Sequence, residues 1–108
     1  MSNKVRYKLL FTTFKNKPVF AKEFEHFITD LIEESLNAYD ETHISETLSE
    51  DKVELQIYLN TDVNLVDVIK DIKQYTTSLM WDIFDEHLKR YYPIKGTLWD
   101  PYVKIHAV

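Results

Sequence analysis

Residues 52–59 alternate strictly between apolar and polar side chains, and this alternation constrains the fold more than any other feature of the chain. The apolar set is Val53, Leu55, Ile57 and Leu59, and the polar set is Lys52, Glu54, Gln56 and Tyr58. Because successive side chains of a β-strand point to opposite faces, the segment predicts a strand with one buried face and one open face. A sheet built around it needs covering elements on one side only.

Three further segments show the same two-residue period and are predicted strands. They are residues 4–14, 42–48 and 101–108, of which the second alternates only weakly. Residues 21–39 instead repeat apolar side chains at a spacing near 3.6, which predicts an amphipathic helix.

A longer helix is predicted after the central strand. Asn64 is placed to cap it, Asp67 stands three residues further on as in a capping box, and Pro93 ends it. Its predicted buried stripe is Leu65, Val68, Ile69, Ile72, Tyr75, Leu79, Ile83 and either His87 or Leu88.

The predicted order of elements is β-α-β-β-α-β, the ferredoxin-like arrangement of an α+β protein. Here a four-stranded antiparallel sheet carries both helices on one face. The 108 residues suffice for one domain and are too few for two, so a single domain is predicted over 1–108. The face that bears Lys52, Glu54 and Gln56 is left to water, a ligand or another chain.

Composition excludes several classes of protein. The chain has no cysteine, which removes disulfides and thiolate zinc sites, and its single glycine, Gly96, excludes a glycine-rich phosphate loop. No apolar run approaches the roughly 20 residues that span a bilayer, and no apolar signal core is seen, so a cytoplasmic protein without a membrane segment is expected. The net charge of −5 counts against a strongly basic footprint but permits a local basic patch.

Four stretches, in order along the chain, resemble blocks of a known family. They are FTTFKNKPVF, DKVELQIYL, LVDVIKDIKQYTTSLMWDIF and LWDPYVKIHAV. Together they are similar to the single-tyrosine transposases of small insertion sequences, and especially to the REP-associated relatives. The resemblance covers nearly the whole chain and implies a protein of a mobile element that acts on DNA.

In that family the third strand carries Asp-His-hydrophobic-His, and the two histidines bind the divalent metal that polarises the scissile phosphate. The matching positions here are Asp51, Lys52, Val53 and Glu54, so both histidines are replaced and an ammonium stands where a cation would bind. The family's catalytic tyrosine lies on a helix after the fourth strand, and the given sequence ends at Val108. The resemblance therefore implies a degenerate member that holds no metal or cofactor and is not an enzyme.

On the open sheet face, Arg6, Lys8 and Lys52 are candidates for holding a phosphate backbone. Arg6 and Lys8 would also neighbour Glu54, and cross-strand pairs of opposite charge contribute only ~0.2–1 kcal/mol each. Two interpretations therefore stay open: a phosphate-binding surface, and a former metal site at Lys52 and Glu54 that ion pairs have closed.

On the long helix, IKQYTTS resembles the family's Leu-Lys-Gly-x-Ser-Ser stretch, a helix region that approaches the DNA hairpin in the family. The resemblance implies phosphate contacts by Lys73, Thr76 and Thr77. Gln74 replaces the family's glycine, which argues against close approach of the backbone. An ordinary amphipathic helix surface is the alternative.

The four histidines, His26, His43, His87 and His106, have no metal-ligand spacing and are interpreted as surface or hydrogen-bonded side chains. The terminal segment would form an exposed edge strand. Because members of the family join two sheets edge to edge, the resemblance implies a homodimer that pairs through this strand.

Two functions fit these observations. The first is a non-catalytic transposase-like protein that binds hairpin or single-stranded DNA and regulates it. The second is an acidic protein–protein interaction module, an inhibitor or regulator encoded by a mobile element or phage, built on the emptied transposase fold. The match over the DNA-facing helix favours the first, and the acidic runs at 33–41 and 48–51 favour the second.

Overall fold

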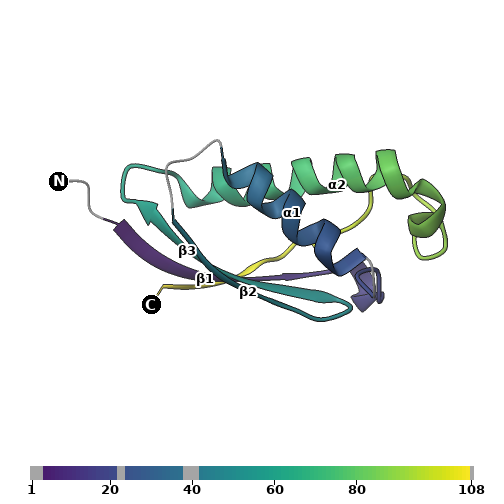
Figure 1. Cartoon of the computed structure of the whole chain (residues 1–108), viewed down its shortest axis with the longest axis horizontal. Helices are drawn as coiled ribbons and strands as arrows, with labels where there is room; N and C mark the ends of the chain where they lie inside the picture. Colours follow the sequence, from purple (N-terminus) through teal and green to yellow (C-terminus); the bar gives the residue numbers. More distant parts are fainter. Residues whose placement is uncertain (1–3, 22–23, 38–41, 108) are drawn as a thin grey trace.

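The computed structural model describes residues 4–21, 24–37 and 42–107. Its elements are β1 (Lys4–Thr12), a short 3-10 helix η1 (Phe14–Asn16), α1 (Phe24–Leu36), β2 (Thr42–Leu48), β3 (Lys52–Asn60), α2 (Leu65–Lys89) and β4 (Lys104–Ala107). Figure 1 shows both helices on one side of the sheet and the other side uncovered. The predicted α+β class, with two helices on an antiparallel sheet, is confirmed. The predicted last residues of the first helix, 38–39, lie outside the described residues.

The strand order in the sheet is β2-β3-β1-β4, and every neighbouring pair is antiparallel. β1 and β3 pair along their full length, from Lys4 opposite Asn60 to Thr12 opposite Lys52. β4 adds only four residues at the other edge of β1, and all four side chains are exposed. The terminal strand begins at Lys104 instead of at the predicted residue 101, because Pro101 has no N–H to donate and the N–H of Tyr102 donates to the Asp100 side chain. Residue 108 of this prediction lies outside the described residues.

The two faces of β1 and β3 differ as the alternation predicts. The inward side chains Val53, Leu55, Ile57 and Leu59 are at most 1% exposed. They pack with Leu9 and Phe11 of β1 and with the inner side chains of both helices, among them Ile28 and Ile72. At ~25 cal/mol per Å² of apolar surface, this burial drives the helices onto one face and leaves the opposite face free.

The long helix begins where the sequence predicts and ends earlier than Pro93 alone requires. The Asn64 side chain accepts a hydrogen bond from the backbone N–H of Val66 at 2.9 Å, which caps the helix. The helix ends at Lys89, followed by Arg90, whose N–H bonds the His87 and Leu88 carbonyls. Within the described residues, no helix is both long and apolar enough to cross a bilayer.

The predicted buried stripe of α2 is wrong at two positions. Tyr75 and Ile83 were predicted to be buried and are 38% and 54% exposed. The fully or nearly buried side chains are Val68, Ile72, Thr76, Met80, Trp81 and Leu88. The backbone of Phe84 is not helical (φ −120°, ψ 37°), so α2 is kinked near its C-terminal end.

Tyr92, just beyond α2, anchors the helix end to the end of β1. Its side chain is 2% exposed and its hydroxyl donates to the Phe14 carbonyl at 2.9 Å. Burial raises the pKa of Tyr92 to about 12, although its hydrogen bonds act in the opposite direction.

Stability should therefore fall at alkaline pH. The unfolded chain loses the Tyr92 proton near pH 10 while the folded chain keeps it, so the stabilisation is complete below about pH 10 and is lost as pH rises towards about 12. Urea unfolding between pH 9 and 12 measures this. We expect Tyr92→Phe to flatten this part of the profile, and an equally steep fall in the variant would contradict the assignment.

Candidate nucleic-acid interface

The open face of the sheet collects positive charge from three strands. The register places Lys8 between Gln56 of β3 and His106 of β4, and Lys104 opposite Leu10. The lysine and arginine side chains on this face of β1, β3 and β4 are Lys4, Arg6, Lys8, Lys52 and Lys104. The same positions hold a single carboxylate, Glu54. A chain with a net charge of −5 therefore has a locally basic sheet face.

One ion pair crosses this face. Lys8 Nζ lies 3.9 Å from Glu54 Oε1, and the two side chains are 42% and 38% exposed. Exposed pairs of this kind contribute roughly 0–1 kcal/mol, so the pair is easily exchanged for a phosphate. Arg6 and Lys52 form no ion pair with any described residue. Of the three candidate cations, only Lys8 is therefore ion-paired as the second interpretation predicts. Arg6 and Lys52 stay available to bind phosphate.

The residues at the positions matched to the family's metal site do not fit a divalent cation. Lys52 brings an exposed ammonium to one ligand position, and the Glu54 carboxylate at the other is shared with Lys8. Divalent cations need several oxygen or imidazole ligands, and an ammonium repels them. Across the described parts of the chain, no group of three or more His, Cys, Asp or Glu side chains could hold a metal ion.

Lys73 is engaged with the protein's own backbone. Its ammonium donates to the carbonyls of Asp100 at 2.9 Å and Pro101 at 3.0 Å. Desolvation by burial lowers the pKa of Lys73, and the nearby Asp100 carboxylate partly opposes this. Lys73 thus joins the middle of α2 to the segment that leads into β4.

Lys73→Met should loosen this segment. The change keeps the length of the side chain and removes two charge-assisted hydrogen bonds, each worth roughly 1.5–3 kcal/mol when intact. We expect the amides of residues 104–107 to exchange at least tenfold faster by hydrogen–deuterium exchange, with β3 unchanged. Lys70→Met, on the exposed surface of the same helix, is the control. Equal protection in both variants would rule out a clamping role for Lys73.

Thr76 was predicted to contact phosphate, and this prediction is wrong. The residue is 0% exposed, and its hydroxyl donates to the Ile72 carbonyl at 2.6 Å and accepts from the Trp99 indole N–H at 2.9 Å. A buried hydroxyl with both partners supplied by the protein has no reach to a ligand. Thr77, by contrast, is half-buried and lines a cleft of about 440 Å³ together with Lys73 and Gly96.

Lys4 and Lys104 are not among the residues predicted from the sequence to bind phosphate. Both lie on the open face beside those that were named. The signal was present in the chain, because the alternation in YVKIHAV puts Lys104 and His106 on one face. Which neighbour they would meet depends on β4 pairing with β1, and the residues alone do not give that register.

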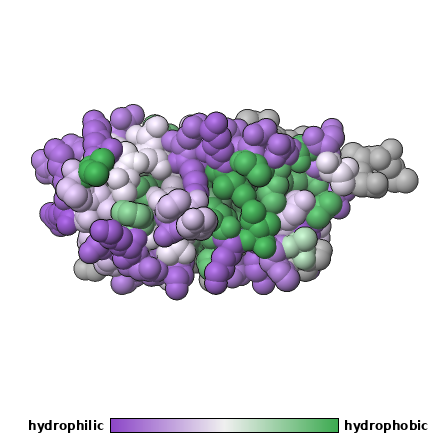
Figure 2. All heavy atoms as spheres, turned by 180° about the vertical axis from the view of Figure 1, so that it is seen from behind, coloured by the Kyte–Doolittle hydropathy of each residue, from purple (hydrophilic) through white to green (hydrophobic). Residues whose placement is uncertain are grey.

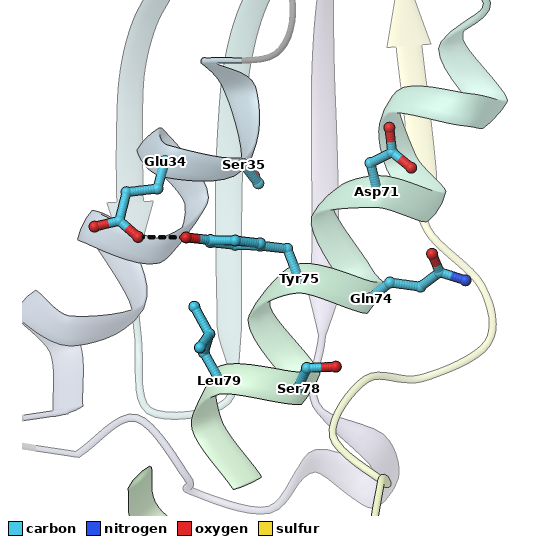
Figure 3. Close-up of a pocket in the computed structure, with 7 residues that line it drawn as sticks. All are labelled: Glu34, Ser35, Asp71, Gln74, Tyr75, Ser78 and Leu79. Atoms are coloured by element: carbon cyan, nitrogen blue, oxygen red, sulfur yellow. Dashed lines mark hydrogen bonds between the residues drawn. The ribbon is translucent and has the colours of Figure 1, made fainter. Parts of the chain in front are cut away.

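A second, acidic feature lies between the helices, away from the sheet face. Figure 3 shows Tyr75 of α2 reaching across to Glu34 of α1, and the hydroxyl donates to the carboxylate at 2.7 Å. This hydrogen bond is the main cause that raises the pKa of Tyr75. The groove measures about 530 Å³ and is lined by Glu34, Ser35, Asp71, Gln74, Tyr75, Ser78 and Leu79. Two of the lining residues, Glu34 and Asp71, carry carboxylates, and none of the lining residues is basic.

Comparisons with known proteins agree with this fold. The family model described as "Transposase IS200 like" matches residues 1–107, and the chain belongs to this family. No curated protein sequence matches the chain significantly.

Two solved structures resemble the chain in fold. The first is a protein from Deinococcus radiodurans R1 assigned as a transposase, with a TM-score of 0.88, 22% identity, and coverage of 100% of this chain and 82% of that one. The second is a REP-associated tyrosine transposase bound to a REP hairpin, with a TM-score of 0.70 and 11% identity. That match covers 100% of this chain and 59% of the other, so the chain spans about three-fifths of that transposase.

Proposed function

We propose that the chain is a non-catalytic, transposase-like DNA-binding protein that holds hairpin or single-stranded DNA on the open face of its sheet and thereby regulates it. The observation that carries the proposal is the segregation of charge. Five lysine and arginine side chains and one carboxylate occupy the open positions of β1, β3 and β4, in a protein that is acidic overall. A local basic strip is the usual electrostatic footprint of a nucleic-acid-binding surface.

The spacing of the cations suits a phosphate backbone. Arg6 and Lys8 are two residues apart on one strand, which corresponds to roughly 6.6 Å along the strand. Phosphates of one DNA strand advance by roughly 3.4 Å per step along the axis of a duplex, so two cations at this spacing can each contact a different phosphate of the same strand. Lys52 and Lys104 extend the strip onto the neighbouring strands. The DNA hairpin bound by the structurally similar REP-associated transposase supports a hairpin as the ligand.

The proposal excludes strand cleavage because of the residues at the former metal positions. With Lys52 and Glu54 in place of two histidines, the sheet face keeps a positive charge that attracts phosphates. It lacks the histidine ligands for the metal ion that would activate a phosphate for cleavage. The same substitution of Lys52 for a metal ligand adds one more phosphate contact. Loss of cleavage and retention of binding thus have a common physical cause.

A homodimer is part of the proposal. β4 is an edge strand, and Ile105 on its helix-facing side is 50% exposed. Figure 2 shows apolar side chains gathered over the centre and right of the face seen from behind Figure 1, bordered by polar ones. Exposed edges and apolar patches favour pairing with another chain. A second copy joined through β4 would make the basic strip continuous across both subunits.

Binding of a labelled hairpin over a salt series tests the proposal. Fluorescence anisotropy between about 50 and 200 mM salt should give a straight line of log K against log salt. A slope near −0.9 per phosphate contacted, or roughly −3 to −5 for one strip, is expected. A hairpin that stays unbound at the lowest salt concentration would refute hairpin binding by this protein.

A second candidate function is an acidic protein-interaction module, and the groove between α1 and α2 favours it. Its carboxylates, Glu34 and Asp71, flank an apolar wall formed in part by Leu79, which suits a basic peptide segment. The two candidates use opposite sides of the molecule. Glu34→Gln would therefore lower the affinity of the groove for a basic peptide. The same change would leave hairpin binding unchanged if DNA occupies the sheet face.

A further inference from the structure

A small basic and aromatic cavity lies where β1 runs into η1 and where the chain leaves α2. It measures about 250 Å³. Its main lining residues are Phe14, Lys15, Lys17, Tyr91, Tyr92 and Ile94. This volume is below the roughly 300–1,000 Å³ of pockets that take drug-sized ligands, so it suits a single ring system. None of the sequence-based candidate residues lies in it.

The floor of the cavity is rigid. The Tyr92 hydroxyl donates to the Phe14 carbonyl, and the two rings are in tilted contact with centroids 6.3 Å apart. The Phe14 N–H donates to the Leu98 carbonyl at 2.9 Å. Tyr91 is half-buried, and its ring packs edge-on against His87 with centroids 5.5 Å apart. Two aromatic side chains are thus held with part of their surface still accessible.

The rim of the cavity is positively charged. Lys15 and Lys17 are its charged lining residues, and no carboxylate lines it. The segments 14–17 and 89–97 together contain five basic residues and no acidic ones. Only Lys89 of these is ion-paired, with Asp85 at 3.0 Å, among the described residues. The charge of the residues lining this cavity is therefore opposite in sign to the charge lining the acidic groove between the helices.

The backbone at the rim is strained. Lys15 and Asn16 have φ values of 58° and 55°, the left-handed region that side chains other than glycine rarely adopt. The Asn16 side-chain amide donates to the Asp51 carboxylate at 3.2 Å, which holds the turn against the hairpin between β2 and β3. The turn brings Lys15 Nζ to 5.6 Å from the Phe14 ring centroid. Strain of this kind is retained where the surroundings fix a functional geometry.

We propose that this cavity binds one unpaired nucleotide of a single-stranded nucleic acid, with the base against Tyr91 and Phe14 and the adjoining phosphate at Lys15 and Lys17. The inference rests on the proposed function, because it extends the same bound strand. The basic sheet face leads directly to the cavity, since Lys52 lies opposite Thr12 and η1 follows two residues later. Stacking on aromatic rings accepts any base, so the cavity would select unpaired nucleotides without reading sequence.

The test compares a blunt hairpin, the same hairpin with a four-nucleotide single-stranded extension on either end, and an unstructured oligothymidylate. Anisotropy should show that one of the extensions tightens binding to the wild-type protein roughly tenfold. Tyr91→Leu and Lys17→Gln should remove that gain without changing affinity for the blunt hairpin. Lys70→Gln removes one charge from an exposed position on α2 and is the matched control. Thermal unfolding confirms that each variant is folded, and Lys17→Gln changes only a partly exposed side chain.

The outcomes separate this inference from the proposed function. If the blunt hairpin binds and neither extension adds affinity, or the gain survives in both variants, the cavity inference fails while the proposed function stands. If the blunt hairpin does not bind but oligothymidylate binds and the variants lose it, the cavity inference holds and hairpin recognition fails. If none of the ligands binds, both are overturned.

Discussion

Reversing the charge of Arg6 and Lys8 together to glutamate should weaken hairpin binding roughly a hundredfold at low salt. Each reversal removes one phosphate contact and adds a repulsive charge to the centre of the basic strip, so each single variant should lose roughly tenfold. Both side chains lie on the uncovered sheet face, and surface changes of this kind usually alter stability by about 0.5 kcal/mol or less. Anisotropy titrations of the folded variants measure the effect.

Two matched variants give the result its meaning. Lys70→Glu makes the same change of charge on α2, on the other side of the sheet, and should lose little affinity. Glu54→Gln removes the strip's one carboxylate and frees Lys8, so it should tighten binding several-fold. If Lys70→Glu weakened binding as much as Lys8→Glu, the effect would be one of total charge, and the sheet face would lose its special role.

Trp99→Ala should cost about 3–5 kcal/mol of unfolding free energy, the usual range for removing a buried tryptophan. The ring is 8% exposed and packs on Phe11 and Phe20, with centroids 5.5 and 5.2 Å away. Its N–H also donates to Thr76. The free energy of unfolding of a small domain is only about 5–15 kcal/mol in total, so this one change should leave the folded protein barely more stable than the unfolded chain.

Urea unfolding of Trp99→Ala should be read against two other variants. Thr76→Val keeps the shape of the side chain but leaves the indole N–H without its acceptor, and should cost about 1–3 kcal/mol. Tyr102→Ala, at a side chain that is 85% exposed, should cost less than about 0.5 kcal/mol. A loss below about 1 kcal/mol for Trp99→Ala would contradict its place in the core.

The fold was predictable where burial follows a local repeat. In β1 and β3 the alternation assigns each side chain to a face, and the observed burial follows it without exception in β3. The stripe of α2 was not predictable to the same degree. Thr76 is polar and is buried because Trp99, 23 residues further on, supplies its partner. The kink at Phe84 likewise has no signature of proline or glycine in the sequence.

The candidate site divides in the same way. Arg6, Lys8 and Lys52 could be assigned to one face from the two-residue period, and the structure places them on that face, with Lys52 opposite Thr12 at the far end of β1 from Arg6. The role of Lys73 could not be predicted from its position on the helix, because its hydrogen-bond partners are the carbonyls of residues 100–101, in a segment far along the chain. The cavity at Lys15 and Lys17 was also hidden, since it forms only when the chain after α2 returns to the end of β1.

A single experiment tests the central claim that this protein holds hairpin DNA without cutting it. The purified protein is incubated with an end-labelled hairpin that carries single-stranded flanks, in low salt with magnesium or manganese, and each sample is divided between a native and a denaturing gel. We predict a shifted complex on the native gel and an intact strand on the denaturing gel. A cleaved strand would contradict the loss of catalysis, and an unshifted hairpin would contradict DNA binding by this sheet face.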